Sequence, residues 1–249
     1  MSTFNRRQFL AAAGMTAPAM MAATLPQSLA AAGPKLNKGA VVLFQGDSIT
    51  DAGRAKDRYY PNQTAGMGNG YAILAAGALM LQQAENELKV YNRGISGNKV
   101  YQLAERWDDD CLNLKPDVLS ILIGVNDFWH KLNGQYSGTV EVYEKDLRAL
   151  LERTRKALPN VKIIIGEPFA VKGGTAINER WYPEFPDYQV AAARIAKAFQ
   201  AAFIPYQQVF DRAITTGGAA YWCPDGVHPS LPGAQLMANA WMEAFDKLK

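Results

Sequence analysis

Short apolar runs alternate with amphipathic stretches along most of the chain. Apolar runs bounded by polar, Gly or Pro residues predict buried strands at 40–45, 88–92, 118–123, 161–166 and 203–205. Apolar positions at helical spacing predict helices at 69–84, 100–112, 140–158, 187–201 and 232–248. Strands buried on both faces and joined by helical crossovers are typical of a parallel sheet. The pattern predicts an α/β fold, a three-layer α/β/α sandwich around a mainly parallel five-stranded sheet.

The first 32 residues differ from this pattern and resemble an export signal. Arg6 and Arg7 form a twin-arginine pair, a long Ala- and Met-rich stretch follows, and the segment ends in three alanines at 30–32. Pro18 and Pro26 interrupt the apolar run, which disfavours a stable membrane-spanning helix. We therefore expect a twin-arginine export signal at 1–32, a single domain at 33–249, a periplasmic or extracellular location, and no stable membrane insertion after cleavage.

Charge and cysteine content narrow the class of protein further. Removing residues 1–32 takes away two arginines and no acids, so the formal net charge falls from +3 to +1. No basic stripe with interleaved aromatics occurs, and we expect no nucleic-acid partner. Cys111 and Cys223 are expected at opposite ends of the sheet, so we predict two separate, partly buried thiols rather than a disulfide.

Polar motifs follow three of the predicted strands, and a fourth comes late in the chain. They are Gly-Asp-Ser-Ile-Thr at 46–50, Asn-Arg-Gly-Ile-Ser-Gly-Asn at 92–98, Gly-Val-Asn-Asp at 124–127 and Asp-Gly-Val-His-Pro at 225–229. In open parallel sheets, ligands bind beyond the carboxyl ends of the strands. These motifs are therefore expected to converge on one edge of the sheet.

Together the motifs supply the groups that acyl transfer requires. Ser48 is a candidate nucleophile, His228 a candidate base, and Asp225, three residues before it, a candidate orienting acid. Suitable donors for a developing oxyanion are the backbone N–H groups of Ser48 and Gly97 and the side-chain amide of Asn126. An ion pair between Asp51 and the nearby Arg54 would brace the nucleophile motif.

These four motifs, in this order, resemble the SGNH hydrolases, or GDSL-type esterases. The family name lists the residues that correspond here to Ser48, Gly97, Asn126 and His228. The resemblance covers residues 40–233 and implies a flavodoxin-like sheet of order 2-1-3-4-5, a serine esterase mechanism, and no cofactor or metal. Ile49 stands where the short family name has Leu, and Thr50 follows it; this variant is similar to a branch rich in esterases acting on small acyl groups and acetylated sugars.

Each motif also has a purely structural interpretation. Ser48 or Asp47 could cap a helix, Gly97 could serve a turn with positive φ, and Asp225-Gly226 could be a simple turn. It would be a rare coincidence for four purely structural motifs to meet at one sheet edge, so a functional site is the better explanation. Other signatures fail, because the chain lacks a Gly-x-Ser-x-Gly elbow and has too few histidines for the usual zinc sites.

The sequence predicts hydrolysis of small acyl esters, above all acetyl groups on carbohydrates. A long irregular segment at 168–186 carries Trp181 and Tyr182, which with Asp127 and Trp129 are candidate substrate contacts. His130 is interpreted as a packed or rim residue, with a place lining the cleft left open. Alternative functions are a lysophospholipase or thioesterase of the same family, a non-catalytic glycan-binding protein and, as the weakest, a nucleotide-binding protein.

Overall fold

The computed structural model describes residues 33–248, and all of these belong to one structural unit. The predicted export signal at 1–32 lies outside the described residues. The fold is built on a five-stranded sheet of order β2-β1-β3-β4-β5 in which every neighbouring pair is parallel. The strands are β1 (Val41–Gly46), β2 (Lys89–Asn92), β3 (Val118–Leu122), β4 (Lys162–Gly166) and β5 (Ala202–Ile204). The strand order confirms the predicted flavodoxin-like α/β fold.

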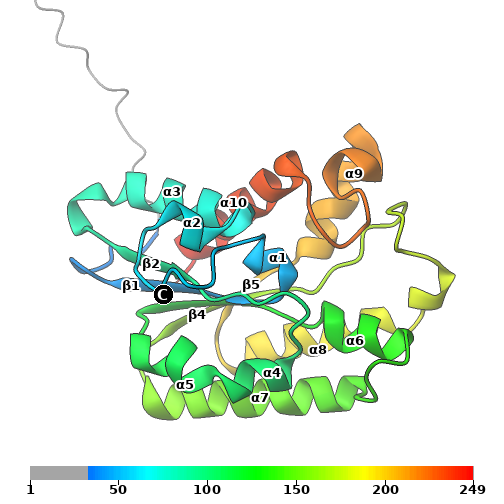
Figure 1. Cartoon of the computed structure of the whole chain (residues 1–249), viewed down its shortest axis with the longest axis horizontal. Coiled ribbons are helices and arrows are strands. Elements are labelled where there is room, and N and C mark those ends of the chain that lie inside the picture. Colours follow the sequence, from blue (N-terminus) through cyan, green and yellow to red (C-terminus); the bar gives the residue numbers. More distant parts are fainter. Residues whose placement is uncertain (1–32, 249) are drawn as a thin grey trace, which may run out of the picture. The chain divides into compact units, whose positions relative to one another are not determined.

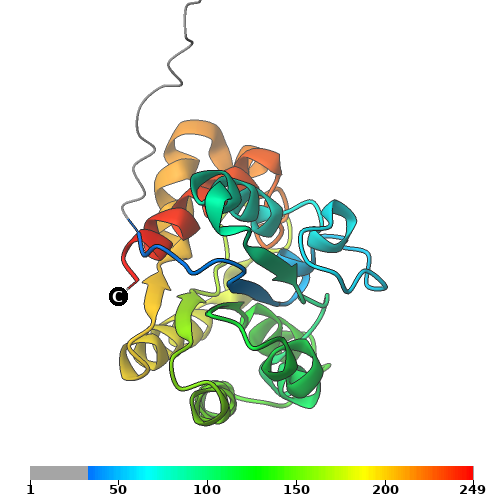
Figure 2. The same cartoon turned by 90° about the vertical axis from the view of Figure 1, so that its left-hand side faces the viewer.

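Helices cover both faces of the sheet, which explains the almost continuous apolar runs of its strands. Helices α2 (Thr64–Met67), α3 (Tyr71–Gln82), α9 (Tyr206–Trp222) and α10 (Leu231–Asp246) lie on one side (Figure 1). On the other side lie α4 (Val100–Glu105), α5 (Trp107–Asp110), α6 (Val125–Leu132), α7 (Val140–Ala157) and α8 (Phe185–Ala198). The two layers are also separate in the perpendicular view (Figure 2). Short pieces complete the fold: α1 (Ser48–Asp51), η2 (Ala84–Asn86), η3 (Leu112–Leu114) and η4 (Glu179–Trp181).

The central strand β3 shows how the layers are joined. Every residue of β3 is buried, although its side chains alternate between the two faces of the sheet. Its one polar residue, Ser120, is satisfied because Trp241 of α10 donates its indole N–H to the Ser120 hydroxyl at 2.9 Å. The Trp241 ring also packs on Phe44 of β1, with ring centroids 5.0 Å apart. The apolar core therefore runs through the sheet, and its buried polar atom has a partner.

The register of the strands brings the polar motifs to one edge. Gly46 at the end of β1 lies opposite Leu122 of β3, which lies opposite Gly166 of β4. The residues that follow these strands therefore begin at the same level of the sheet. This alignment explains why motifs separated by about 30 to 180 residues can form one site at the carboxyl edge.

The helix prediction differs from the structure in three places. The expected helix 100–112 is divided into α4, α5 and η3. Arg106, with φ/ψ of −110° and 10°, separates α4 from α5, and Cys111, with φ/ψ of −141° and −63°, separates α5 from η3. Helix α6, which follows β3 directly, was not among the predicted helices. Helix α9 was not predicted either. The α9 segment includes Thr215, Thr216 and two glycines, residues of modest helix propensity, and it kinks at Gly218. Tertiary packing of its buried Tyr206 and Phe210 stabilises this helix despite its composition.

Both cysteines are free, as predicted, but they are fully buried rather than partly buried. Burial raises the pKa of each thiol to about 12, with a further increase from Asp110 at Cys111 and from Asp225 at Cys223. Within residues 33–248, no helix is both long enough and apolar enough to span a bilayer.

Candidate active site

Ser48 begins α1 immediately after β1, at the carboxyl edge of the sheet. Asp47 caps this short helix, because its Oδ1 accepts the backbone N–H of Ile49 at 3.0 Å. The preceding Gly46 has no room for a side chain, since a Cβ there would lie 2.3 Å from the carbonyl oxygen of Leu122. The tight turn and its cap therefore place Ser48, which is partly exposed, above the end of the strand.

The Ser48 hydroxyl contacts His228, a residue 180 positions away in the chain. Ser48 Oγ lies 2.7 Å from His228 Nε2, and His228 Nδ1 lies 2.7 Å from Asp225 Oδ2. The hydrogen bond to Asp225 raises the pKa of His228 against the opposing effect of burial. Burial also opposes ionisation of Asp225, but hydrogen bonds from the His228 ring and from the backbone amides of His228 and Val227 lower its pKa to about 2. Asp225 is therefore an ionised partner for the imidazole at neutral pH.

The long segment 168–186 supports the Asp225–His228 turn through its backbone. The N–H of Val171 donates to the Gly226 carbonyl at 2.8 Å, and the N–H of Ala176 donates to the Asp225 carbonyl at 3.0 Å. A third bond joins the N–H of Thr175 to the carbonyl of Pro224 at 3.0 Å. The segment thus fixes the position of the acidic turn, a role that its side-chain composition did not reveal.

The three predicted oxyanion donors have N–H groups without a protein acceptor in the described part of the chain. Among residues 33–248, the backbone N–H groups of Ser48 and Gly97 have no protein acceptor. Gly97 has a φ of +81°, a conformation that glycine adopts without strain. The Asn126 side-chain amide donates to the Asn98 carbonyl at 3.3 Å, which leaves its second N–H free of a protein partner. All three predicted donors thus have an N–H group available. The bond from Asn126 to Asn98 also joins Asn126 to the loop that contains Gly97.

Asp51 ties this loop to the nucleophile helix. Its Oδ2 accepts both the backbone N–H and the hydroxyl of Ser96, each at 2.9 Å. The expected ion pair with Arg54 is wrong, because Asp51 pairs with Lys56 at 2.9 Å and the Arg54 side chain instead donates to the Gly94 carbonyl at 2.7 Å. Burial opposes ionisation of Asp51, but Lys56 and Ser96 outweigh it and lower its pKa. Asp51 is therefore a positioning residue that sequence reasoning assigned to the wrong partner.

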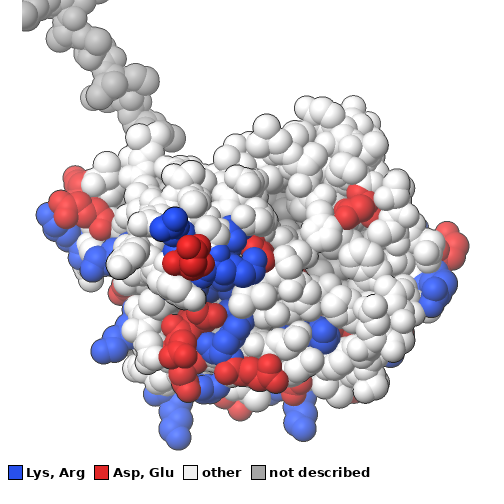
Figure 3. Space-filling view, viewed as in Figure 1, with Lys and Arg blue, Asp and Glu red and all other residues white. Residues whose placement is uncertain are grey.

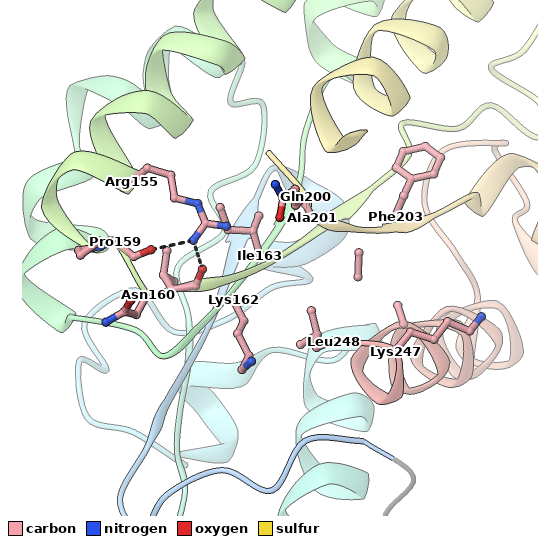
Figure 4. Close-up of a pocket in the computed structure, with 13 residues that line it drawn as sticks. Arg155, Pro159, Asn160, Lys162, Ile163, Gln200, Ala201, Phe203, Lys247 and Leu248 are labelled. Carbon is pink, nitrogen blue, oxygen red and sulfur yellow. Dashed lines mark hydrogen bonds between the residues drawn. The ribbon is translucent and has the colours of Figure 1, made fainter. Parts of the chain in front are cut away.

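A small pocket of about 130 Å³ opens beside Ser48. Its lining consists of Ser48, Ile49, Ala52, Asn69, Gly70, Tyr71, His228, Pro229 and Ala234. Sequence reasoning did not assign Asn69 and Gly70 to the site, because they belong to none of the four motifs. A larger cavity of about 540 Å³ lies at the other end of the sheet, beside the amino ends of β4 and β5 (Figure 4). The larger cavity contains none of the predicted catalytic residues.

Two of the predicted substrate contacts lie inside the protein. Asp127 is 2% exposed, and its Oδ1 accepts the N–H of Val100. Trp181 is fully buried, donates its indole N–H to the Ala176 carbonyl at 3.1 Å and packs against Phe128 with centroids 5.2 Å apart. The expectation that these two side chains contact substrate is wrong. Trp181 instead anchors the 168–186 segment, because its apolar ring removes more surface from water inside the core.

Trp129 and Tyr182, the other two candidates, remain partly exposed. Trp129 packs on Trp181, with ring centroids 5.6 Å apart, and the Lys172 ammonium lies 4.8 Å from the Tyr182 ring centroid. Within residues 33–248, no cluster of three or more His, Cys, Asp or Glu side chains is arranged to hold a metal ion. The groups that lie together at the carboxyl edge are a hydroxyl, an imidazole, a carboxylate and several N–H donors.

Comparison with known proteins identifies the same family that the four motifs resemble. The GDSL-like lipase/acylhydrolase family matches residues 44–236. An acetylxylan esterase from Geobacillus stearothermophilus is 35% identical over 213 residues, which cover 84% of this chain and 94% of that protein. The crystal structure of an acetylxylan esterase from the same organism has a TM-score of 0.75 at 32% identity, covering 85% of this chain and 96% of that one. Two further structures of that enzyme are described as catalytic mutants, one with a serine and one with an aspartate changed to alanine.

A second solved structure is more similar in sequence. The crystal structure of a protein described as a GDSL-like lipase from Parabacteroides merdae has 53% identity and a TM-score of 0.83, covering 85% of this chain and 99% of that one. Sequence and fold therefore agree over nearly the whole length of these relatives. The chain belongs to the GDSL-like lipase/acylhydrolase family and is a carboxylic ester hydrolase.

Proposed function

We propose that this protein is a serine esterase that removes acetyl groups from carbohydrates, with Ser48, His228 and Asp225 as its catalytic triad. The observation that carries the proposal is the continuous chain of two 2.7 Å contacts from Ser48 Oγ through the imidazole to the Asp225 carboxylate. A serine hydroxyl is a weak nucleophile unless a base removes its proton, and this arrangement supplies both the base and its orienting acid.

The reaction proceeds in two steps. Ser48 Oγ bonds to the ester carbonyl carbon and gives its proton to His228 Nε2, while the carbonyl electron pair moves onto oxygen. The N–H groups of Ser48, Gly97 and Asn126 bind that oxyanion, where fixed donors lower the barrier most. His228 then protonates the departing alcohol as its C–O bond breaks, which leaves the acyl group on Ser48. Water repeats the sequence and releases the acid.

The acyl preference follows from the space beside Ser48. The pocket of about 130 Å³ is well below the roughly 300–1,000 Å³ of sites that hold drug-sized ligands. Its walls belong to α1, to the start of α3 with the two residues before it, to the turn after His228 and to α10, so a long acyl chain would have to displace packed structure to lie wholly inside it. Displacement of this kind costs about 1–3 kcal/mol or more. These dimensions favour an acetyl group.

Two observations support a carbohydrate as the alcohol component. The Geobacillus relative is an acetylxylan esterase. In the space-filling view, charged side chains of both signs gather in the middle of the face, near α2, and toward α4 and α5, whereas the surface toward α9 is mostly uncharged (Figure 3). A neutral polyol suits such a surface better than a charged lipid headgroup, because an unpaired charge in a partly desolvated site is costly.

The test compares acyl chains and alcohols on one purified protein. We expect kcat/KM for p-nitrophenyl esters to fall by roughly tenfold or more from acetyl to octanoyl, because extra methylenes overpack the pocket. We also expect acetate release from acetylated xylo-oligosaccharides, and loss of both activities in Ser48→Ala. A preference for octanoyl or lysophospholipid esters would replace the carbohydrate assignment with a lysophospholipase. A folded Ser48→Ala protein with unchanged turnover would exclude the serine mechanism.

A further inference from the structure

His130 and Lys99 form a polar pair beside the predicted oxyanion donors. Lys99 Nζ lies 3.0 Å from His130 Nδ1, and the Cε1 edge of the His130 ring is 3.9 Å from the position that a Cβ on Gly97 would occupy. The mechanism above uses neither side chain. The pair therefore needs a separate explanation, because a nearly buried lysine beside a catalytic loop is costly to maintain.

The lysine determines which nitrogen of His130 carries the proton. An ammonium group has donors and no acceptor, so Lys99 must donate to a lone pair on Nδ1. Burial and the charge of Lys99 both lower the pKa of His130, which keeps the ring neutral at pH 7. A neutral ring whose Nδ1 accepts a hydrogen bond carries its proton on Nε2. His130 therefore presents a fixed Nε2–H donor.

Aromatic rings hold Lys99 in place for this purpose. Its ammonium lies 5.7 Å from the Tyr101 ring centroid and 5.4 Å from that of Tyr136. The two tyrosine rings stack on each other at 5.8 Å with an interplanar angle of 20°. Cation–π attraction of this kind offsets part of the cost of burying the charge. Asp127 also favours the charged form of Lys99.

The Nε2 atom of His130 has no such partner. Among residues 33–248, nothing accepts a hydrogen bond from it, and the atom is not fully buried. It is therefore accessible to solvent, and the Cε1 atom bonded to it lies next to Gly97. A rigid donor that is left unsatisfied beside a reactive centre is suited to bind an oxygen atom of a ligand.

The position of His130 indicates which half of the ester it meets. The small pocket beside Ser48 is lined by α1, by the start of α3 with the residues before it, and by the segment from His228 to the start of α10. Helices α3 and α10 cover one side of the sheet. His130 belongs to α6, on the other side (Figure 1). If the acetyl group fills the pocket and the oxyanion lies between the two sides, the alcohol must extend toward α6.

We propose that His130 is a substrate-binding residue whose Nε2–H donates a hydrogen bond to a hydroxyl or ring oxygen of the sugar that carries the acetyl group. This inference rests on the proposed function. A site that supplies a fixed donor discriminates against alcohols without an acceptor, because the buried or half-buried donor then loses its bond to water without replacement. His130 would thereby favour polyol acetates over simple aryl acetates.

The kinetic test compares two acetates in His130→Leu and His130→Gln. Leucine removes the donor at similar size, whereas glutamine can place an amide N–H near the position of Nε2. We expect His130→Leu to raise KM for an acetylated xylo-oligosaccharide by about 2- to 12-fold, the range for one net neutral hydrogen bond. Its KM for phenyl acetate, whose alcohol half has no other oxygen, should change less than twofold. His130→Gln should restore much of the saccharide affinity.

Each other result overturns a definite claim. An equal KM increase for both acetates would mean that His130 only supports the Gly97 loop, and failure of His130→Gln to recover saccharide binding would exclude the donor role. If the wild-type protein hydrolyses phenyl acetate but not the saccharide, both the carbohydrate assignment and the His130 contact fail. Wild-type saccharide turnover with an unaffected His130→Leu variant would overturn the His130 proposal alone.

A spectroscopic test requires no turnover. The chain has only two histidines, so long-range ¹H–¹⁵N spectra of the imidazoles contain few signals, and His130→Gln assigns them. We expect His130 at pH 7.5 to show a protonated Nε2 and an unprotonated Nδ1. Lys99→Met should increase the population of the other tautomer, because the donor to Nδ1 is gone. A predominant Nδ1–H tautomer in the wild-type protein would overturn the proposal.

Discussion

Asp225 contacts His228 twice: its Oδ2 lies 2.7 Å from the ring Nδ1, and its Oδ1 accepts the backbone N–H of the same residue at 2.7 Å. Because the two residues are three positions apart, one turn fixes both the ring and its partner. The carboxylate thus sets the orientation and the tautomer of the imidazole that faces Ser48.

Replacing Asp225 with Asn should lower kcat for p-nitrophenyl acetate by about 10³–10⁴-fold. The amide N–H of asparagine can face Nδ1 and thereby favour the tautomer with a protonated Nε2, which cannot accept the Ser48 proton. Steady-state kinetics test this prediction. Asp57→Asn, at an exposed aspartate, is the matched control and should leave kcat unchanged. An Asp225→Asn variant within tenfold of wild type would show that Asp225 does not direct the imidazole.

The pH dependence of kcat/KM should report His228. The hydrogen bond to Asp225 raises the pKa of His228 above 6.5, and only the neutral ring accepts a proton. Activity is therefore expected to fall as pH decreases through an apparent pKa above 6.5, and to remain high at pH 8. Rates with p-nitrophenyl acetate between pH 5 and 9 measure this acid limb. His130→Gln should leave its midpoint in place, whereas a midpoint at or below 6.5 would contradict the assignment.

Asn126→Ala should lower kcat by about 10²–10³-fold with a much smaller change in KM. The amide is expected to act mainly on the charge that develops in the transition state, so ground-state binding changes little. Kinetics with p-nitrophenyl acetate measure the two constants. Asn113→Ala, an exposed asparagine paired with Asp109, is the control. A normal kcat would mean that Asn126 serves only to hold the Asn98 carbonyl.

Trp181→Ala should destabilise the fold rather than remove a substrate contact. Truncation of a fully buried tryptophan costs about 3–5 kcal/mol, which corresponds to a decrease in Tm of about 6–20 °C for a domain of this size. Calorimetry measures the change, and Tyr221→Ala at an exposed ring should shift Tm far less. A variant with the wild-type Tm but weaker saccharide binding would show that Trp181 lies at the surface of the cleft and contacts the substrate.

Export is a prediction from residues 1–32 alone. Changing Arg6 and Arg7 to Lys should retain the precursor in the cytoplasm, because the twin-arginine pair is the recognition signal for that route. Cell fractionation and amino-terminal sequencing test this expectation. Exported protein should begin near residues 31–33, and secreted material that still begins at Met1 would contradict cleavage.

The strand pattern and the four motifs could be predicted from the sequence because each depends on neighbouring residues. The apolar run of β3 reflects burial on both faces of the sheet, and parallel strands bring their carboxyl ends to one edge. The motif at 225–229 likewise contains both Asp225 and His228, so their contact needs only a local turn. By itself, the sequence therefore determined the fold class and indicated the residues that meet at the sheet edge.

Contacts between distant segments were decided only by the tertiary structure. Asp51 binds Ser96, 45 residues away, rather than the nearby Arg54 side chain, because the sheet register brings the 94–98 loop against α1. Trp181 lies in the core since Phe128 of α6 packs against it, and no local pattern distinguishes a buried ring from an exposed one. The backbone bonds from the 168–186 segment to the Asp225–His228 turn are invisible in the sequence, because every residue except proline has the same N–H and carbonyl groups.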